Sequence, residues 1–145
     1  MKHVRAILFL AAPFFLAAAA QAAPAGWKAT LSRDGKCAAM VPGDWGAVGQ
    51  GMQAPHGLSH VRAIFRSGAM ADEKGLVANM FAIKTTFEDS AGRYWVELGG
   101  LASGALRQWH VAVPGDGGVC VAEIAFDKSF SEAGAKTVAL SLRGQ

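Results

Sequence analysis

The sequence predicts an α+β fold, in which an antiparallel β-sheet of about six to seven strands is packed by a C-terminal helix and a mid-chain helix. Short segments of alternating apolar and polar residues are separated by Gly, Pro and Asp, which is typical of β-hairpins. The end of the chain has helical apolar spacing after a run of serines. Because hairpin connections dominate, an antiparallel sheet covered by helices follows.

The N-terminal segment 1–22 has the pattern of a cleaved signal peptide. Two basic residues precede an apolar stretch over 7–20, and Ala20-Gln21-Ala22 fits the small-x-small pattern that signal peptidase reads. The stretch is shorter than the roughly 20 residues that a membrane-spanning helix needs. We therefore expect cleavage after Ala22, a single domain over 23–145 without a membrane anchor, and a periplasmic or secreted location.

Removal of this segment lowers the net charge of the chain. The full sequence has 14 Lys and Arg residues and 11 Asp and Glu residues, and the segment contains Lys2 and Arg5 but no acid, so 12 basic residues remain against 11 acidic ones. A protein with a net charge near +1 lacks the basic surface expected for nucleic-acid binding. We therefore expect no nucleic-acid partner.

Cys37 and Cys120 are the two cysteines of the chain. In an oxidising compartment a disulfide is more common than two free thiols or half a metal site. No C-x-x-C spacing is present to favour a redox role. The sequence therefore predicts a structural disulfide that closes a loop of about 84 residues.

Alternating patterns predict the first strands. Segments 27–31 and 36–41 form a hairpin, with Cys37, Ala39 and Val41 on one face of the second strand. Pro42-Gly43 then suits the central positions of a type II turn. Residues 46–57 lack apolar periodicity, which predicts a loop, and alternation returns in a strand over 60–66.

The middle of the chain predicts a helix over 71–81, with Asp72 and Glu73 near its positive end. Segment 83–98 reads as two strands joined at 89–92, although a helix over 84–92 is a competing assignment. Two further strands, over 106–113 and 119–126, form a hairpin. The second of them directs Cys120 into the apolar layer that Cys37 can also reach.

The C-terminal segment predicts the clearest helix. Ser129-Phe130-Ser131-Glu132 fits a capping box, and Glu132 and Lys136 have the spacing of a favourable ion pair. Arg143-Gly144 suits the C-terminal end of the helix. The predicted buried stripe consists of Ala135, Val138, Ala139 and Leu142.

The chain resembles the PsbP-like fold in three places. These are an N-terminal hairpin leading into C-x-x-x-V-P-G-D-W, a closing strand V-C-V-A-E-I-A-F and a final helix that ends A-L-S-L. The resemblance implies an α+β domain shared by extrinsic subunits of photosystem II and by small exported bacterial proteins of unknown function. PsbP-like proteins share no catalytic residues, so the resemblance implies no active site.

Catalytic and metal-binding patterns are weak. His56 and His60 have a helical ligand spacing, but Pro55 and Gly57 argue against a helix there. No G-x-S-x-G motif is present, and the acids near 88–97 flank a turn, where carboxylates are usually solvated. We expect no catalytic residues, no metal site and no cofactor.

The candidate binding surface combines an aromatic residue with basic ones. Trp45, the 46–57 segment, Arg62 and Arg66 are expected to border a groove, which Arg93 and Arg107 extend. Solvated arginines and aromatic residues that seal the sheet are the alternative interpretation. The predicted function is a noncatalytic exported binding or accessory module for an unknown protein or a small anionic ligand. The competing class is a small periplasmic hydrolase or an inhibitor of an extracellular hydrolase.

Overall fold

The protein is described by a computed structural model that covers residues 20–80, 82–99 and 105–145. Its strands are β1 (Trp27–Leu31), β2 (Cys37–Pro42), β3 (Gly46–Val48), β4 (Gly51–Gln53), β5 (His60–Ser67), β6 (Ile83–Glu88), β7 (Tyr94–Leu98), β8 (Arg107–Gly115), β9 (Gly118–Phe126) and β10 (Arg143–Gly144). The helices are α1 (Met70–Met80) and α2 (Glu132–Ser141).

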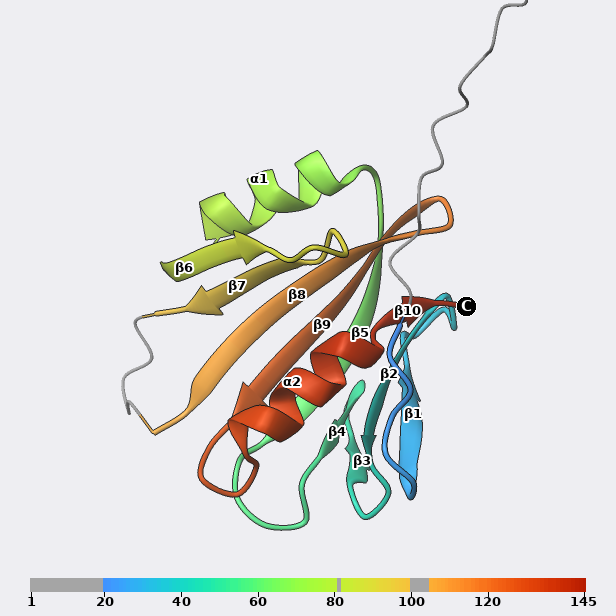
Figure 1. The fold of residues 1–145 in the computed structure, drawn as a ribbon, viewed down its shortest axis with the longest axis vertical. Helices are drawn as coiled ribbons and strands as arrows, with labels where there is room; N and C mark the ends of the chain where they lie inside the picture. Colours follow the sequence, from blue (N-terminus) through green and yellow to red (C-terminus); the bar gives the residue numbers. More distant parts are fainter. Residues whose placement is uncertain (1–19, 81, 100–104) are drawn as a thin grey trace, which may run out of the picture.

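Seven strands form one antiparallel sheet in the order β3-β4-β5-β9-β8-β7-β6. Helix α2 lies across one face of this sheet, and α1 packs on the other (Figure 1). The predicted α+β class, the antiparallel sheet and the C-terminal helix are confirmed. The hairpin interpretation of residues 83–98 is also confirmed, because β6 and β7 pair through a turn at 89–92.

Alternation along the central strands produces two different faces. Trp109 and Val111 of β8 point into the main core beneath α2, together with Ile124 of β9. The alternate residues of β8, His110 and Ala112, point to the α1 face, where Ala112 joins a smaller apolar cluster. Both faces of the central strands are therefore covered, which explains their nearly continuous apolar sequence.

A second sheet, in the order β1-β2-β10, lies beside α2 on the same face of the large sheet (Figure 1). The predicted disulfide is confirmed: Cys37 of β2 bonds Cys120 of β9, with an S–S distance of 2.02 Å and a Cα–Cα distance of 5.6 Å. Both cysteines are completely buried in the main core. The bridge therefore fixes the small sheet to the large one.

The ends of α2 differ from the predicted ones. Its N-cap is Ser131, whose side chain accepts a hydrogen bond from the N–H of Gly134. Ser129 instead bonds the carboxylate of Asp127. After the helix, Arg143 and Gly144 pair with β2 as β10, so Gly144 is not a helix cap. The predicted buried stripe of α2 is confirmed.

Two predictions near the end of β2 are corrected: the 46–57 segment is not an irregular loop, and the turn at Pro42-Gly43 is shifted by one residue. The 46–57 segment contains the β3–β4 hairpin, whose tight turn places Gly49 at a φ of 58°. The turn after β2 is centred on Gly43 and Asp44, because the N–H of Trp45 donates to the carbonyl of Pro42. A Cβ atom on Gly43 would lie 2.3 Å from the carbonyl oxygen of Gly26, so close backbone approach explains this glycine. Among the described helices, none is long and apolar enough to cross a membrane.

Candidate functional site

The five predicted binding residues do not form one surface. Trp45 is 4% exposed, and its ring packs edge-on against Phe130 at 4.8 Å in the main core. Arg62 and Arg66 lie on β5 and pair with acids of the α1 face, whereas Arg93 and Arg107 lie on the α2 face. The structure therefore places Arg62 at one groove and Arg93 and Arg107 at another, while Trp45 and Arg66 line neither.

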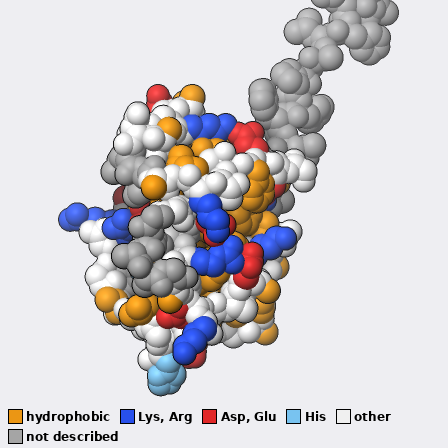
Figure 2. Space-filling view, turned by 90° about the vertical axis from the view of Figure 1, so that its left-hand side faces the viewer, with side chains coloured by type: hydrophobic (Ala, Val, Ile, Leu, Met, Phe, Trp, Pro, Cys, Tyr) orange, Lys and Arg blue, Asp and Glu red, His pale blue; other side chains and the backbone are white. Residues whose placement is uncertain are grey.

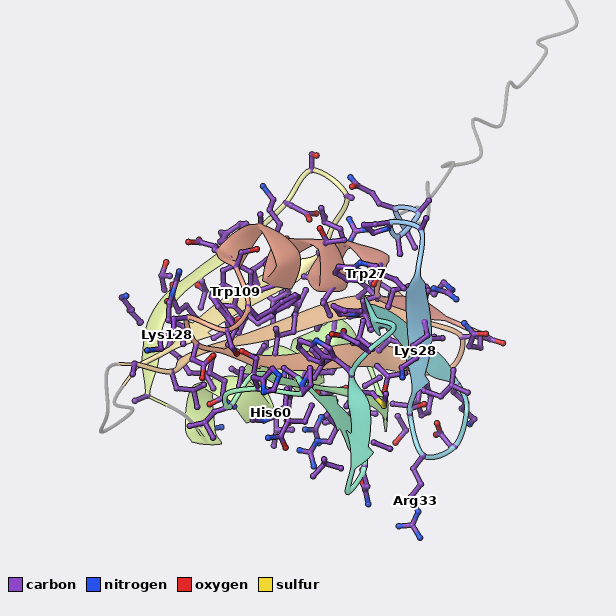
Figure 3. All side chains as sticks on the ribbon, turned by 90° about the horizontal axis from the view of Figure 1, so that it is seen from below. Trp27, Lys28, Arg33, His60, Trp109 and Lys128 are labelled. Carbon is purple, nitrogen blue, oxygen red and sulfur yellow. A yellow bond between two sulfur atoms is a disulfide. The ribbon has the colours of Figure 1, made fainter. Side chains whose placement is uncertain are left out.

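The first site is a groove of about 460 Å³ beside the β3–β4 hairpin. It brings Arg62 together with the 46–57 segment, as the sequence predicted, and adds His60 and Glu123. The guanidinium of Arg62 is held by Glu123, with an Nη2–Oε2 distance of 2.6 Å. His60 lies on the side of the strands away from α2 (Figure 3). The lining thus combines this charged pair with His60 and with Val48 and Met52 of the β3–β4 hairpin.

Arg66 belongs to a buried polar network under α1. Glu73 of α1 is 3% exposed and accepts from His110, at 2.8 Å, while its second oxygen lies 3.2 Å from Nε of Arg66. Burial lowers the pKa of His110, although the neighbouring Glu73 carboxylate opposes this. This network anchors α1 on the sheet, so Arg66 has a structural partner.

The second site is a groove of about 550 Å³ between α2 and the β6–β7 hairpin. We call it the aromatic groove; its walls include Thr85, Phe87, Trp95 and Trp109 from the sheet and Lys136 and Leu140 from α2. Trp109 lies between the strands and α2 (Figure 3). Figure 2 faces the β6 side of the molecule and shows basic and acidic side chains next to exposed hydrophobic surface. This groove is larger than the first and has an apolar floor.

Aromatic side chains from four neighbouring strands form a row along this face. Phe87 stacks on Trp95 with 5.5 Å between ring centroids and 9° between the planes. Trp95 meets Trp109 edge-on at 5.7 Å, and Trp109 meets Phe126 edge-on at 4.8 Å. The inner rings are buried, but Phe87, on the terminal strand β6, is 55% exposed. The row therefore ends in an aromatic ring that a ligand can reach.

Arg107 organises the charges at one side of the aromatic groove. Its Nε lies 2.9 Å from Glu97 and its Nη1 2.8 Å from Glu132, while the guanidinium lies over the ring of Trp109 at 5.6 Å. The hydrogen bond from Arg107 lowers the pKa of Glu97. The two carboxylates raise the pKa of Arg107. These contacts therefore favour the charged forms of Arg107 and Glu97 and hold the guanidinium in place.

Arg93 and Asp89 form a second charged pair at the groove. The pair has an Nη1–Oδ2 distance of 3.6 Å, and Arg93 also donates to the carbonyl of Leu140 at 3.3 Å. Burial opposes ionisation of Asp89, but hydrogen bonds from Trp95 and from backbone N–H groups outweigh it and lower its pKa. Arg93 thus connects the hairpin to α2 across the groove.

The aromatic row was not predicted from the sequence. Alternation does place Trp95 and Trp109 on strands, but a single sequence does not reveal which strands pair or in which register. Within the described residues, no three His, Cys, Asp or Glu side chains come together in an arrangement that could hold a metal ion. No protein-family model matches the chain, and a search of curated proteins finds no match.

Proposed function

We propose that the protein is an exported, noncatalytic binding module that takes its ligand in the aromatic groove. The observation that supports this function best is the exposed ring of Phe87 at the end of a rigid, buried aromatic row. Rigid aromatic side chains provide a large contact area with little loss of conformational entropy on binding. The groove also has the volume typical of small-molecule sites.

The pKa values of the carboxyl groups in the groove support a binding function over hydrolysis. A general acid of a glycosidase needs a carboxyl group whose pKa is raised, so that it is protonated near neutral pH. The pKa values of Asp89 and Glu97 are instead lowered by their hydrogen-bond partners. These carboxylates therefore suit the positioning of Arg93 and Arg107 better than proton transfer.

Export is part of the same proposal. The Cys37–Cys120 disulfide is consistent with an oxidising compartment. The expected cleavage after Ala22 would also remove Gln21 from the wall of the groove, where its N–H donates to the carbonyl of Leu140. The mature chain would then present a more open groove. The resemblance to PsbP-like proteins remains a proposal of the same kind, and it fits an accessory role.

An NMR titration tests the proposed function. The isotope-labelled protein is mixed with the small-molecule fraction of a periplasmic extract, and the indole N–H of Trp95, which donates to Asp89, is the reporter. We expect this signal and its groove neighbours to shift. Phe87→Ala should abolish the shifts, because it removes the open aromatic face.

Leu31→Ala is the matched control, because Leu31 is 52% exposed and lies on β1, outside the groove. This variant should keep the full response. Shifts confined to Arg62 and Glu123 would place the site in the other groove and contradict the proposal. Conversion of the bound compound into a product would contradict the noncatalytic assignment.

A further inference from the structure

Lys136 differs from the other cations of the aromatic groove. Arg93 and Arg107 are each bound to carboxylates, whereas Lys136 makes no ion pair with any residue that the structure describes. The partner that the sequence suggested for it, Glu132, is bound to Arg107 instead. Lys136 is exposed on α2 and lines the groove. Its ammonium group is therefore available to a ligand.

The pattern of ion pairs in the groove favours an anion. The charged side chains that line it are three cations and three carboxylates: Arg93, Arg107 and Lys136 against Asp89, Glu97 and Glu132. Each of the three carboxylates already has a cationic partner. A ligand cation would therefore have to displace an arginine or lysine from a carboxylate, whereas an anionic group can pair with Lys136 without breaking an ion pair.

The apolar floor limits the ligand further. The open ring of Phe87 offers a flat surface for stacking, and Trp95 supports it from behind at 5.5 Å. A cavity of about 550 Å³ suits a compound of small-molecule size. A fully hydrated inorganic ion would leave this aromatic surface in contact with water, so an apolar body is needed to cover it.

We propose that the aromatic groove binds an organic monoanion with a flat apolar body. The apolar body stacks on Phe87, and the acidic group pairs with Lys136 of α2. This inference rests on the proposed binding function and adds the chemical class of the ligand. It also assigns different roles to the two walls: β6 binds the apolar part and α2 selects the charge.

Two nearly isosteric probes, 1-naphthoate and the neutral 1-naphthamide, separate charge selection from stacking. Each is titrated into the protein by calorimetry, with the Trp95 indole signal recorded in parallel. We expect naphthoate to bind about three- to fivefold more tightly in about 20 mM salt, since an exposed ion pair contributes modestly. The difference should shrink in about 0.5 M salt because of screening.

Lys136→Gln should remove the preference for naphthoate and leave the binding of naphthamide unchanged. Lys128→Gln is the matched control, because Lys128 is also an exposed lysine but does not line the groove. It should keep the preference. Phe87→Ala should weaken the binding of both probes.

Equal binding of the two probes, with Phe87→Ala weakening both, would overturn the anion preference and leave the binding function standing. Equal losses in Lys136→Gln and Lys128→Gln would also overturn it, because they would show nonspecific attraction. Absence of binding by either probe would refute this ligand class. The titration with periplasmic extract decides the binding function separately.

Discussion

His110 is a buried ionisable residue that couples folding to pH. Its side chain is almost inaccessible, at 1% exposure, and it faces Glu73 of α1, Arg66 of β5 and Glu123 of β9. With His110 neutral, the two acids are balanced by Arg66 and Arg62. Protonation would place a positive charge in this buried site, so burial lowers the pKa of His110, although the Glu73 carboxylate opposes the shift.

The lowered pKa predicts that the free energy of unfolding falls as the pH drops below about 6.5. The folded state binds fewer protons than the unfolded state in this range, because the unfolded histidine titrates at its ordinary pKa while the folded one titrates at a lower pH. Urea denaturation at about pH 7.5 and about pH 5.5 measures the difference in the free energy of unfolding. Both pH values lie above the range in which carboxyl groups usually titrate, so carboxylates contribute little to the difference.

His110→Gln should lose this part of the pH dependence while the glutamine amide keeps a donor for Glu73. The exposed His56 provides the matched variant, His56→Gln, which should retain the dependence. Equal pH dependence in the His110→Gln variant and the unmodified protein would show that other groups control stability in this range.

At the scale of single elements, the start of α2 provides a direct test of capping. Ser131→Ala removes the acceptor for the N–H of Gly134, so we expect a loss of about 1 kcal/mol in the free energy of unfolding. The amide of Gly134 should also exchange faster with solvent. Ser129→Ala is the comparison, because Ser129 binds Asp127 and should not affect that amide. Faster exchange of Gly134 in Ser129→Ala alone would identify Ser129 as the cap.

The same helix shows how far the sequence predicts an element. The spacing of Ala135, Val138 and Leu142 predicted its buried face correctly, because a helix has a fixed period and this face is apolar. Both of its ends were predicted wrongly. Ser129 and Ser131 are equally good caps by residue type. Ser129 does not cap the helix, because it donates hydrogen bonds to the Asp127 carboxylate in the preceding loop. Gly144 is removed from the helix by its pairing with β2, a long-range contact.

The strands of the candidate site could also be predicted only in part from the sequence. Alternation predicted which residues of β2 share a face, and pairing of the predicted hairpins followed from their turns. The order of the hairpins in the sheet was not predictable, although it decides that Phe87 lies on the terminal strand. The register also matters: Arg62 pairs with Glu123 and Arg107 with Phe126 of β9, which point to opposite faces of the sheet. Local patterns thus predicted the elements, and the site depends on their arrangement.

The disulfide acts on the whole molecule, because it joins two sheets that share no strand. Cys37 and Cys120 are 83 residues apart in sequence, so their bond restricts a large part of the unfolded chain. The β1–β2–β10 sheet also contributes Cys37, Ala39 and Val41 to the main core. Opening of the bridge therefore raises the conformational entropy of the unfolded state and weakens the attachment of the small sheet to the large one.

The double variant Cys37→Ala/Cys120→Ala should unfold with a free energy lower by about 2–4 kcal/mol. This is a large part of the roughly 5–15 kcal/mol that stabilises a typical domain. Urea denaturation measures the change, and alanine is chosen because both positions are completely buried. A reductant should destabilise the unmodified protein by a similar amount and leave the double variant unchanged. Equal stability of the oxidised protein and the double variant would show that core contacts alone hold the two sheets together.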